Sequence, residues 1–466
     1  MQQTANWERI LLSALVFVLM LIVVLAGGPH QEAFGDVRKA DVIVGSTVEE
    51  RGLTVAQCPS LDAEYATLVD ADGEVLFERN AETETQIASI TKVMTAIVAL
   101  ENAKDGTFVA VSEDAATIGE SSAGLQQGDV MDMDAALKAL LVPSGNDAAL
   151  AIAETVGGQI LVSDPSMGDS PVAAFVAAMN AKAAEIGCTN TIYENPHGLD
   201  DGEFAGNLHS TAADQAKVAK CAMSNDKIRE IVSGGSTTIT VDRDGSKEKV
   251  ELETTDELLE MYEYTIGIKT GVTDLAGPSF MGAANKDGRE LYAIILGSSD
   301  EHQRFVDCMS LFEWGFDHVC EVPLASSAQQ TNATIGGSSA TVPVLAEVSH
   351  GDWIDKTVKA TIGDPEAKIF VFDFEGNVSQ SVEFDDLTGT VNAGDRVGTI
   401  QYKQKNEVVA SRDLIACETV EAPNGIDAIG IAWQRFIGGF NGSPSRAESK
   451  IYNVMPIINN YKTNAA

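Results

Sequence analysis

The sequence reads Ile87-Ala-Ser-Ile-Thr-Lys-Val-Met-Thr-Ala96 at the start of its clearest helical pattern. Apolar residues recur at helical spacing between positions 89 and 101, at Ile90, Val93, Met94, Ile97 and Val98. Ser89 and Lys92 stand three positions apart in this predicted helix, so they share one face, with Cβ atoms roughly 5–6 Å apart. A serine hydroxyl becomes an effective nucleophile only when a neighbouring base takes its proton. The pattern therefore predicts a nucleophilic serine with a lysine as its base.

A lysine acts as a base only in its neutral form. Lowering the pKa of Lys92 from about 10.4 to near 7 costs roughly 4 kcal/mol, and burial or a second cation nearby must supply that shift. Two other Ser-x-x-Lys segments occur, at Ser224–Lys227 and Ser246–Lys249. Both lie in polar surroundings without an apolar helical face, so we interpret them as chance matches on the surface.

Two further segments accompany the first in chain order. Ser144-Gly-Asn146 lies in the expected loop between two alanine-rich helices, and it offers a hydroxyl for proton transfer and a carboxamide for holding a peptide bond. Lys269-Thr-Gly271 ends an apolar, strand-like run. It supplies a cation and a hydroxyl for a carboxylate, and a glycine that lets a substrate lie against the strand. β-Lactamases and penicillin-binding proteins carry Ser-x-x-Lys, Ser-Asp-Asn and Lys-Thr-Gly motifs in the same order.

With all three segments present, the sequence resembles the low-molecular-mass penicillin-binding DD-carboxypeptidases. The resemblance covers roughly residues 55–320, and Ala393-Gly-Asp-Arg-Val-Gly398 is similar to part of the family's β-rich C-terminal domain. Further similar blocks are Asn195–Asp200, His209–Asp214, Gly267–Gly277 and, in the closing helix, Arg304, Asp307 and Trp314–Phe316. The middle motif is Ser-Gly-Asn, the carboxypeptidase form, where class A β-lactamases have Ser-Asp-Asn.

The resemblance implies catalytic roles for Ser89, Lys92 and Ser144. Ser89 is expected to attack the carbonyl of the penultimate D-Ala with Lys92 as the base. Ser144 and Asn146 are expected to relay protons and to position the peptide. Water then releases the acyl-enzyme, and no metal or organic cofactor is expected.

The resemblance also implies a substrate-binding set, which consists of Asn146, Lys269, Thr270, Gly271 and Val272. Lys269 and Thr270 are expected to hold the terminal carboxylate, while the substrate lies against the strand at Gly271. The backbone N–H groups of Ser89 and Val272 are expected to form the oxyanion hole, in which a donor is typically worth about 3–4 kcal/mol in rate terms.

The expected activity is removal of the terminal D-Ala from peptidoglycan stem peptides, with β-lactam antibiotics as covalent inhibitors. A DD-endopeptidase or transpeptidase on the same scaffold is the main alternative, followed by a β-lactamase and by a non-catalytic wall-binding protein. His197 is a second candidate for the general base. Because Lys92 is available, a structural hydrogen bond in the loop of His197 is the favoured interpretation. The other five histidines form no metal-ligand spacing.

The order of the expected elements argues for an α+β domain with one central antiparallel sheet, at residues 55–321. A strand hairpin comes first, helices follow, strands return and a helix closes the domain. The expected segments are 65–79 for the hairpin, 133–142, 147–156, 172–186 and 211–223 for the helices, 236–241, 249–252, 264–269, 279–284 and 290–296 for the strands, and 301–314 for the last helix. The resemblance makes this a transpeptidase domain of the penicillin-binding and serine β-lactamase-like type.

The remaining C-terminal sequence has two parts. Residues 322–420 alternate as strands without helical periodicity, which predicts a separate small all-β domain. Residues 421–466 carry an amphipathic segment and a tail. Six apolar residues fall within a helical stripe about 100° wide, at Ile426, Ile429, Trp433, Phe436, Ile437 and Phe440. This stripe predicts either a helix lying on a membrane surface or a helix docked on its own protein.

Residues 1–28 determine the expected compartment. The apolar run Ile10–Ala26 is interrupted only by Ser13 and is either a cleaved signal peptide or a retained membrane anchor. Either interpretation places the rest of the chain outside the cytoplasm, in the cell envelope. Residues 29–54 are expected to be a linker.

Charge and cysteine content narrow the class of protein further. The net charge of −38, from 31 Lys+Arg and 69 Asp+Glu, repels polyphosphate backbones and excludes nucleic acid as a partner. We interpret it as the acidic, solvated surface of an exported protein, with a high-salt habitat as the alternative. The six cysteines match no zinc pattern. They are expected either to pair in part in an oxidising compartment or to remain free, buried thiols.

Overall fold

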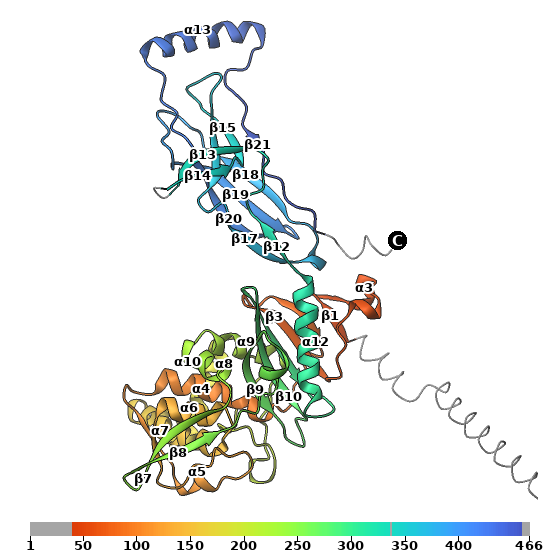
Figure 1. The fold of residues 1–466 in the computed structure, drawn as a ribbon, viewed down its shortest axis with the longest axis vertical. Helices are drawn as coiled ribbons and strands as arrows, with labels where there is room; N and C mark the ends of the chain where they lie inside the picture. The colour runs from red at the N-terminus through yellow and green to blue at the C-terminus, as the bar shows by residue number, and fades with distance from the viewer. Residues whose placement is uncertain (1–39, 336–337, 459–466) are drawn as a thin grey trace, which may run out of the picture. The chain divides into compact units, whose positions relative to one another are not determined.

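The computed structural model describes residues 40–335 and 338–458 (Figure 1). The chain divides into two compact units, residues 1–316 and residues 317–466, close to the boundary expected after residue 321. The expected signal or anchor segment at residues 1–28 lies outside the described residues. Within the described part of the chain, no helix has both the length and the apolar character needed to cross a membrane.

A seven-stranded antiparallel sheet forms the frame of the first unit, in the order β2-β1-β4-β3-β11-β10-β9. Its strands are β1 Asp41–Ile43, β2 Ser46–Thr47, β3 Tyr65–Asp70, β4 Val75–Arg79, β9 Thr265–Gly271, β10 Ser279–Lys286 and β11 Arg289–Leu296. The predicted β3–β4 hairpin is confirmed, and it turns at Gly73, where φ is +90°. Strand β9, which ends in the Lys-Thr-Gly motif, lies at the edge of the sheet, so one side of its backbone has no strand partner among the described residues.

Neighbouring residues of the central strands pack on opposite faces of this sheet, as the period of two in a strand requires. Phe280 of β10 packs on Phe305 of helix α12 (Gln303–His318), with ring centroids 5.0 Å apart. The next residue, Met281, joins the apolar core that the sheet shares with the other helices. A Cβ at Gly315 of α12 would lie 2.6 Å from the Leu68 side chain, so α12 approaches β3 closely.

The helical part of the first unit consists mainly of α4 Thr91–Asn102, α6 Met133–Leu141, α7 Asn146–Ser163, α8 Pro171–Glu185, α9 Ala212–Met223 and α10 Asp226–Ser233. The helices predicted from the alanine-rich stretches are confirmed. Side-chain N-caps precede three of them, α6, α8 and α9, since Asp132, Ser170 and Thr211 each accept a backbone N–H three residues later. A Cβ at Gly157 would lie 1.9 Å from the carbonyl oxygen of Pro171, so α7 and α8 pack with almost no separation there.

Two predicted strands belong to a second, smaller sheet rather than to the central one. β7 (Thr237–Arg243) and β8 (Ser246–Leu252) continue the order β5-β6-β7-β8 from β5 (Phe108–Ala110) and β6 (Val130–Asp132). Alternation in sequence predicts a strand but not its partner, which explains the difference. Two hydrogen bonds of 2.7 Å between the Arg243 guanidinium and the Asp129 carboxylate support the junction of β6 and β7.

The prediction of a linker over residues 29–54 is wrong for residues 41–47, which form strands β1 and β2 of the central sheet. A buried ion pair holds this edge. The Asp41 carboxylate accepts from Arg79 Nε at 2.6 Å and from Arg79 Nη2 at 2.9 Å, and Arg79 also donates to the carbonyl of Leu61. Strands of two and three residues are too short to show a period of two in the sequence, although Ile43 of β1 is fully buried.

The second unit contains the predicted all-β domain. A six-stranded sheet has the order β18-β19-β20-β16-β15-β21, while β12 pairs with β17 and β13 pairs with β14. The strands are β12 Val319–Pro323, β13 Gln330–Ile335, β14 Ser338–Pro343, β15 Ala346–Ser349, β16 Thr357–Ile362, β17 Lys368–Phe372, β18 Ser379–Phe384, β19 Arg396–Gln404, β20 Glu407–Ala416 and β21 Lys450–Ile451. Lys405 and Asn406 join β19 to β20 with φ values of +48° and +68°, as a tight hairpin turn requires.

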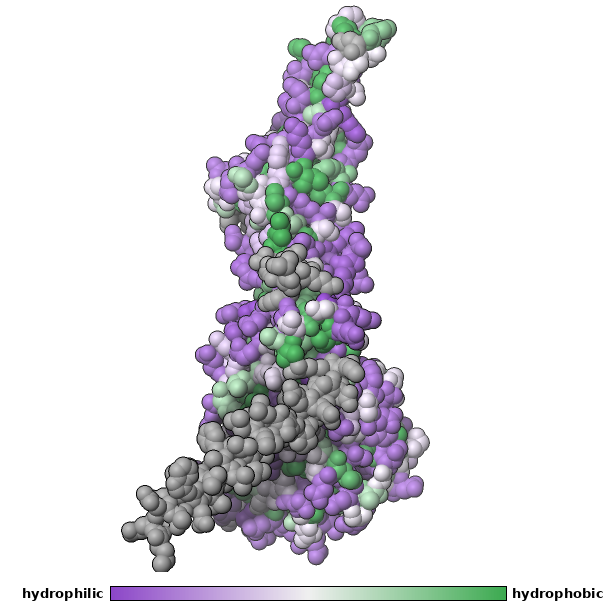
Figure 2. Space-filling view, turned by 90° about the vertical axis from the view of Figure 1, so that its right-hand side faces the viewer, coloured by the Kyte–Doolittle hydropathy of each residue, from purple (hydrophilic) through white to green (hydrophobic). Residues whose placement is uncertain are grey.

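The amphipathic segment forms helix α13 (Gly425–Asn441), which the chain inserts between β20 and β21 (Figure 1). Asn424 caps its first turn and Gly442, with a φ of +74°, ends it. The apolar stripe is not buried: its six residues are between 44% and 84% exposed. Arg435 donates to the carbonyl of Gly351 at 2.6 Å, so the polar side of the helix contacts its own domain. The helix is thus attached to its own domain through a polar side chain, while its apolar stripe stays exposed. Figure 2 shows apolar residues gathered at the tip that bears α13.

Candidate active site

Ser89 lies in a short 3₁₀ turn, Ala88–Ile90, that leads into α4. Ala88 has a φ of +47°, a strained value for a residue with a side chain. Gly198, from a distant loop, packs directly on this turn, since a Cβ there would lie 1.9 Å from the Ala88 carbonyl oxygen. The predicted helix therefore begins two residues after Ser89, but the spacing that places Ser89 beside Lys92 is kept.

Lys92 is fully buried and lies within hydrogen-bond distance of the nucleophile. Its Nζ is 2.7 Å from Ser89 Oγ and 2.8 Å from the His197 carbonyl oxygen. Burial lowers the pKa of Lys92 well below its usual value, and the charge of Lys269 lowers it further. A neutral amine in this position donates one N–H to His197 and has its lone pair available for the Ser89 proton.

Ser144 and Asn146 stand at the turn between α6 and α7. Ser144 has a φ of +66° and is 4% exposed, while Asn146 is the first residue of α7. The Asn146 amide donates to the Gly119 carbonyl at 3.0 Å, and its Oδ1 is buried with no hydrogen-bond partner. Since the amide nitrogen is fixed, the unpartnered oxygen is the atom of Asn146 that remains available to accept an N–H of a substrate.

Lys269 and Thr270 lie at the end of the edge strand β9. Lys269 Nζ donates to the Thr270 carbonyl at 3.1 Å and to Thr270 Oγ1 at 3.3 Å. Thr255, which the sequence did not reveal as part of the site, places its hydroxyl 2.6 Å from Thr270 Oγ1. The Thr255 N–H also donates to the Val142 carbonyl just before the Ser144 turn, so one residue connects both motif segments. Burial, with the charge of Arg304, lowers the pKa of Lys269 to about 7.

Gly271 brings the end of β9 beside the Ser89 turn, since a Cβ at Gly271 would lie 2.9 Å from the Ile87 carbonyl oxygen. Arg304 of α12 donates to the Gly271 carbonyl at 3.2 Å, and its Nε is buried without a hydrogen-bond partner. Arg304 is thus a second cation next to the motif, a role that was not predicted although Arg304 is among the residues that resemble the family. Val272 follows Gly271 and is half exposed.

The structure brings the first and third predicted motifs together at Ser89, Lys92 and Gly271, and Thr255 links the second motif to the third. The serines of the two other Ser-x-x-Lys segments lie in other elements. Ser224 is the C-cap of α9, and Ser246 begins strand β8. His197 is buried, with a pKa lowered to about 3 first by burial and then by Lys92. Its Nδ1 accepts the Leu199 N–H at 3.2 Å. The structural interpretation of the His197 ring is therefore supported, and its carbonyl, rather than its ring, contacts Lys92.

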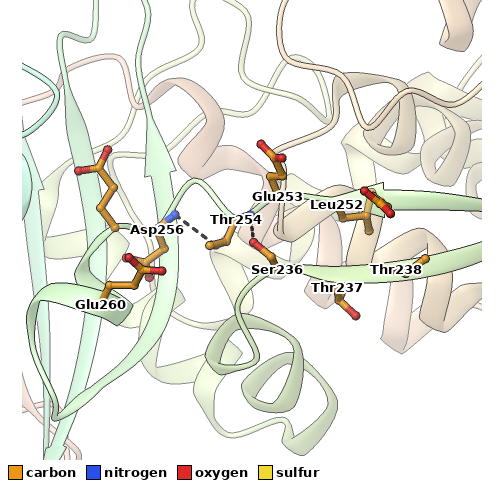
Figure 3. Close-up of a pocket in the computed structure, with 10 residues that line it drawn as sticks. Ser236, Thr237, Thr238, Leu252, Glu253, Thr254, Asp256 and Glu260 are labelled. Atoms are coloured by element: carbon orange, nitrogen blue, oxygen red, sulfur yellow. Dashed lines mark hydrogen bonds between the residues drawn. The ribbon is translucent and has the colours of Figure 1, made fainter.

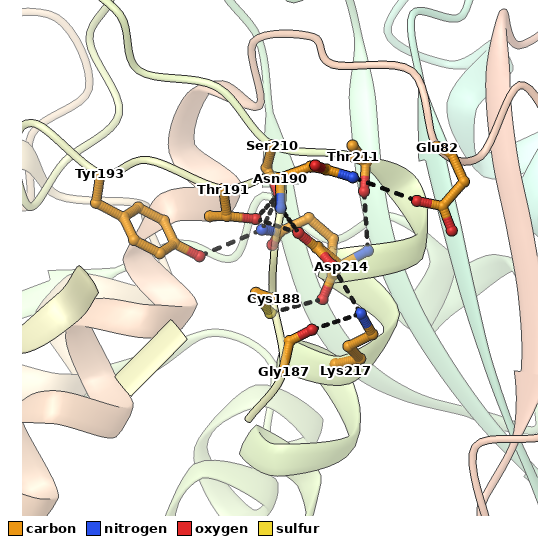
Figure 4. Close-up of polar contacts among 11 residues, drawn as sticks. Glu82, Gly187, Cys188, Asn190, Thr191, Tyr193, Ser210, Thr211, Asp214 and Lys217 are labelled. Atoms are coloured by element: carbon orange, nitrogen blue, oxygen red, sulfur yellow. Dashed lines mark hydrogen bonds and ion pairs between the residues drawn. The ribbon is translucent and has the colours of Figure 1, made fainter. Parts of the chain in front are cut away.

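The loop that carries His197 is anchored by the buried carboxylate of Asp214 on α9 (Figure 4). Asp214 Oδ2 accepts the Asn190 N–H and the Thr191 hydroxyl, both at 2.8 Å, while Oδ1 pairs with Lys217 at 2.8 Å. These contacts fix the segment leading into Asn195-Pro-His197. The Asp214 network therefore supports the carbonyl that receives the Lys92 N–H.

A pocket of about 540 Å³ lies between the base of the β7–β8 hairpin and the short helix α11 (Leu258–Met261), next to the loop that carries Thr255 (Figure 3). Its carboxylates are those of Glu251, Glu253, Asp256, Glu257 and Glu260. Burial raises the pKa of Asp256 to about 7, although Lys269 and Arg304 act in the opposite direction. The residues of the three motifs do not line this pocket. Within residues 40–335 and 338–458, no three His, Cys, Asp or Glu side chains are grouped so as to hold a metal ion.

An α+β domain in which a serine contacts a buried lysine of its Ser-x-x-Lys motif, beside a Lys-Thr-Gly edge strand, defines an active-serine enzyme of the penicillin-binding type. The sequence profile described as D-alanyl-D-alanine carboxypeptidase, of the peptidase S11 family, matches residues 53–300. The chain belongs to this family of serine peptidases.

Individual relatives agree with the family match. The chain is 27% identical over 372 residues to the D-alanyl-D-alanine carboxypeptidase DacF of Bacillus subtilis, covering 77% of this chain and 86% of that protein. It is 35% identical over 265 residues to DacB2 of Mycobacterium tuberculosis, covering 55% and 84%. A mutant of the Streptomyces K15 DD-transpeptidase is similar in structure, with 27% identity, a TM-score of 0.51 and coverage of 56% and 100%. DacD of Francisella tularensis shares the fold over 80% of this chain and 96% of its own, with 22% identity and a TM-score of 0.53.

Proposed function

We propose that the chain removes the terminal D-Ala from peptidoglycan stem peptides through an acyl-enzyme on Ser89. The observation that carries this proposal is the 2.7 Å contact between Ser89 Oγ and a fully buried Lys92 Nζ. Lys92 takes the hydroxyl proton as Oγ bonds to the carbonyl carbon of the penultimate D-Ala. The backbone N–H groups of Ser89 and Val272 stabilise the resulting oxyanion. The carbon–nitrogen bond then breaks as the Ser144 hydroxyl gives its proton to the departing amine and takes up the proton that Lys92 received from Ser89, so Lys92 is neutral again.

Substrate binding in this proposal uses groups at the end of the edge strand β9 together with Asn146 of α7. Lys269 and Thr270 attract the terminal carboxylate, with Arg304 as a second cation beside Gly271. Asn146 Oδ1, which is buried without a partner, accepts an N–H of the peptide. Water completes the reaction by attacking the ester carbon. Lys92 removes the water's proton, and the proton returns to Ser89 as the oxygen–carbon bond breaks.

The test of the proposed reaction combines labelling with product analysis. Fluorescent penicillin is expected to label the protein at Ser89, and peptide mass mapping locates the adduct. A soluble pentapeptide ending in D-Ala-D-Ala is expected to release free D-Ala, while a cross-linked dimer stays intact. An adduct at Ser224 or Ser246 contradicts the assignment of the nucleophile. Cleavage of the dimer in preference to the pentapeptide favours the endopeptidase alternative, and no adduct at all favours a wall-binding protein.

We also propose that the enzyme works outside the cytoplasm and that α13 lies on a membrane surface. The support for the second statement is the exposed stripe on a helix that is capped at both ends, because water does not favour so many exposed apolar side chains on one face. Trp433 and Phe436 stack with ring centroids 5.8 Å apart and form the centre of this stripe.

Vesicle binding tests the role of α13. Protein without residues 1–28 is expected to sediment with zwitterionic lipid vesicles, and replacing Trp433 and Phe436 with Ser is expected to weaken that binding. Replacing the exposed polar residue Gln434 with Ser is the matched control and leaves binding unchanged. If the parent protein does not bind the vesicles, α13 is not a membrane helix.

A further inference from the structure

A side-chain hydrogen bond connects two loops that each serve the catalytic centre. The hydroxyl of Thr273 donates to Asp200 Oδ2 at 2.7 Å, although the two residues are 73 positions apart in the sequence. Asp200 is 5% exposed. Thr273 Oγ1 also accepts the N–H of Ala276 at 3.1 Å, so the hydroxyl both donates and accepts, which fixes its orientation.

Within three residues of this bond in the sequence, each of the two loops has a residue placed at the catalytic centre. The loop of Asp200 carries the His197 carbonyl, which accepts from Lys92, and Gly198, which packs on the carbonyl of Ala88. The loop of Thr273 begins with Val272, the residue assigned to the oxyanion hole. The bond between Asp200 and Thr273 therefore spans the gap between the loop that holds the base and the loop that supplies an oxyanion donor.

Fold stability alone does not explain a carboxylate at this position. Asp200 Oδ1 is buried with no hydrogen-bond partner, and an unsatisfied buried acceptor costs stability. Burial raises the pKa of Asp200, the Thr273 bond opposes that rise, and the nearby Asp201 and Asp274 add to it. Unsatisfied polar groups that persist in a folded protein tend to mark functional positions.

We propose that Asp200 and Thr273 are positioning residues that hold the Val272 N–H in line with the carbonyl attacked by Ser89. The inference rests on the proposed function and assigns these two residues a part in acylation. Neither residue touches the substrate; their effect passes through the backbone of Val272. Losing the bond lets the loop after β9 shift, and an oxyanion donor is effective only when its position is fixed beforehand.

The test compares variants that remove the bond with variants that keep it. Asp200→Ala and Thr273→Val are expected to lower the rate of Ser89 acylation by penicillin about tenfold, within the range of one weakened oxyanion donor. The fall is expected in kcat rather than in KM for a D-Ala-D-Ala peptide. Thr273→Ser and Asp200→Asn keep a donor and an acceptor, and both are expected to acylate near the wild-type rate. Asp201→Ala, at the exposed neighbouring position, is the matched control.

The double variant distinguishes a shared role from two separate ones. If the bond acts as a unit, Asp200→Ala combined with Thr273→Val acylates no more slowly than either single variant. Additive losses overturn the proposal, as does a lower Tm with an unchanged acylation rate in the folded protein. Failure of Thr273→Ser to restore the rate also overturns it. If the wild-type protein forms no adduct at Ser89, the proposed function fails and the role of this bond in acylation fails with it, whereas a labelled wild-type protein with additive variants overturns only the role of the bond.

Discussion

In the first unit, charged side chains are buried: Lys92 and Lys269 are 0% and 1% exposed. In the second unit, apolar side chains are exposed: Ile426 and Phe440 of α13 are 84% and 79% exposed. Both arrangements run against the usual distribution of side chains between core and surface. Both cost stability, and neither is needed to build its domain, because each unit has its own apolar core of ordinary residues.

The buried lysines and the exposed apolar residues serve two different kinds of function. Burial changes the chemistry of a lysine, because it favours the neutral amine over the cation. Exposure leaves the chemistry of Ile426 or Phe440 unchanged and prepares them for contact with another apolar phase. All residues of the three motifs lie in the first unit, so the second unit is expected to determine where the reaction occurs rather than how it proceeds.

The largest expected effect comes from Lys92→Ala, which removes the buried base. Acylation by penicillin is expected to fall by about 10²–10⁴, the usual contribution of a general base. Stopped-flow labelling measures the rate, and Tm shows that the protein is folded. Lys227→Ala, in the chance Ser-x-x-Lys match, is the control and is expected to acylate normally. A Lys92→Ala protein that is labelled at the wild-type rate contradicts the role of this lysine.

The lifetime of the penicillin adduct is expected to far exceed that of the peptide acyl-enzyme. Departing D-Ala leaves room for water at the ester, whereas the opened penicillin ring stays attached and obstructs it. Glu154 and Glu185 lie within α7 and α8, and Glu194 is engaged with the Asn207 N–H at 2.6 Å, so none of the three has the context of a deacylating base. Intact-protein mass after removal of excess penicillin G measures the lifetime. Loss of the adduct within seconds, with turnover to penicilloic acid, identifies a β-lactamase.

The pH dependence of kcat/KM is expected to be bell-shaped, because the two buried lysines are needed in opposite states. The acid limb rises as Lys92, whose pKa burial lowers well below its usual value, loses its proton and becomes a base. The alkaline limb falls about tenfold per pH unit above the pKa of Lys269, which is about 7, because neutral Lys269 no longer attracts the carboxylate. In Lys269→Arg the alkaline limb is expected to disappear, since arginine stays protonated. An unchanged limb in that variant shows that another group titrates.

The smallest effect on the hydrolysis rate is expected from removing the second unit. A chain that ends at Pro323 lacks the all-β domain and α13, yet it is expected to hydrolyse a soluble D-Ala-D-Ala peptide at the wild-type rate. The reason is that every contact described for the catalytic centre joins residues before position 317. A folded, inactive truncation contradicts the division of labour between the units.

The sequence predicted those parts of the site that repeat a local pattern. Ser89 and Lys92 were found because helical spacing puts them on one face, and β9 was found from its apolar run. Thr255, Arg304 and Asp200 were not assigned roles, because only tertiary packing brings them to Thr270, Gly271 and Thr273. A threonine or an aspartate in a loop has no periodicity that marks its partner.

The fold was predictable to a similar degree and for similar reasons. Helices such as α6 and α7, of 9 and 18 residues, are rich in alanine, the residue that most favours a helix, so their existence follows from the sequence. Strand β1 has three residues and is joined to β4 by the buried pair of Asp41 with Arg79. Its place in the sheet therefore became visible only in the structure.

The insertion of α13 between β20 and β21 gives the helix two covalent routes to its domain. Residues 417–424 lead into the helix from β20, and residues 442–449 lead back to β21, which pairs with β15. A terminal helix is lost when a protease cuts its single connection. Here one cut in either arm leaves α13 joined through the other, so release requires two cleavages. The insertion therefore protects the attachment of the helix against a single proteolytic cut.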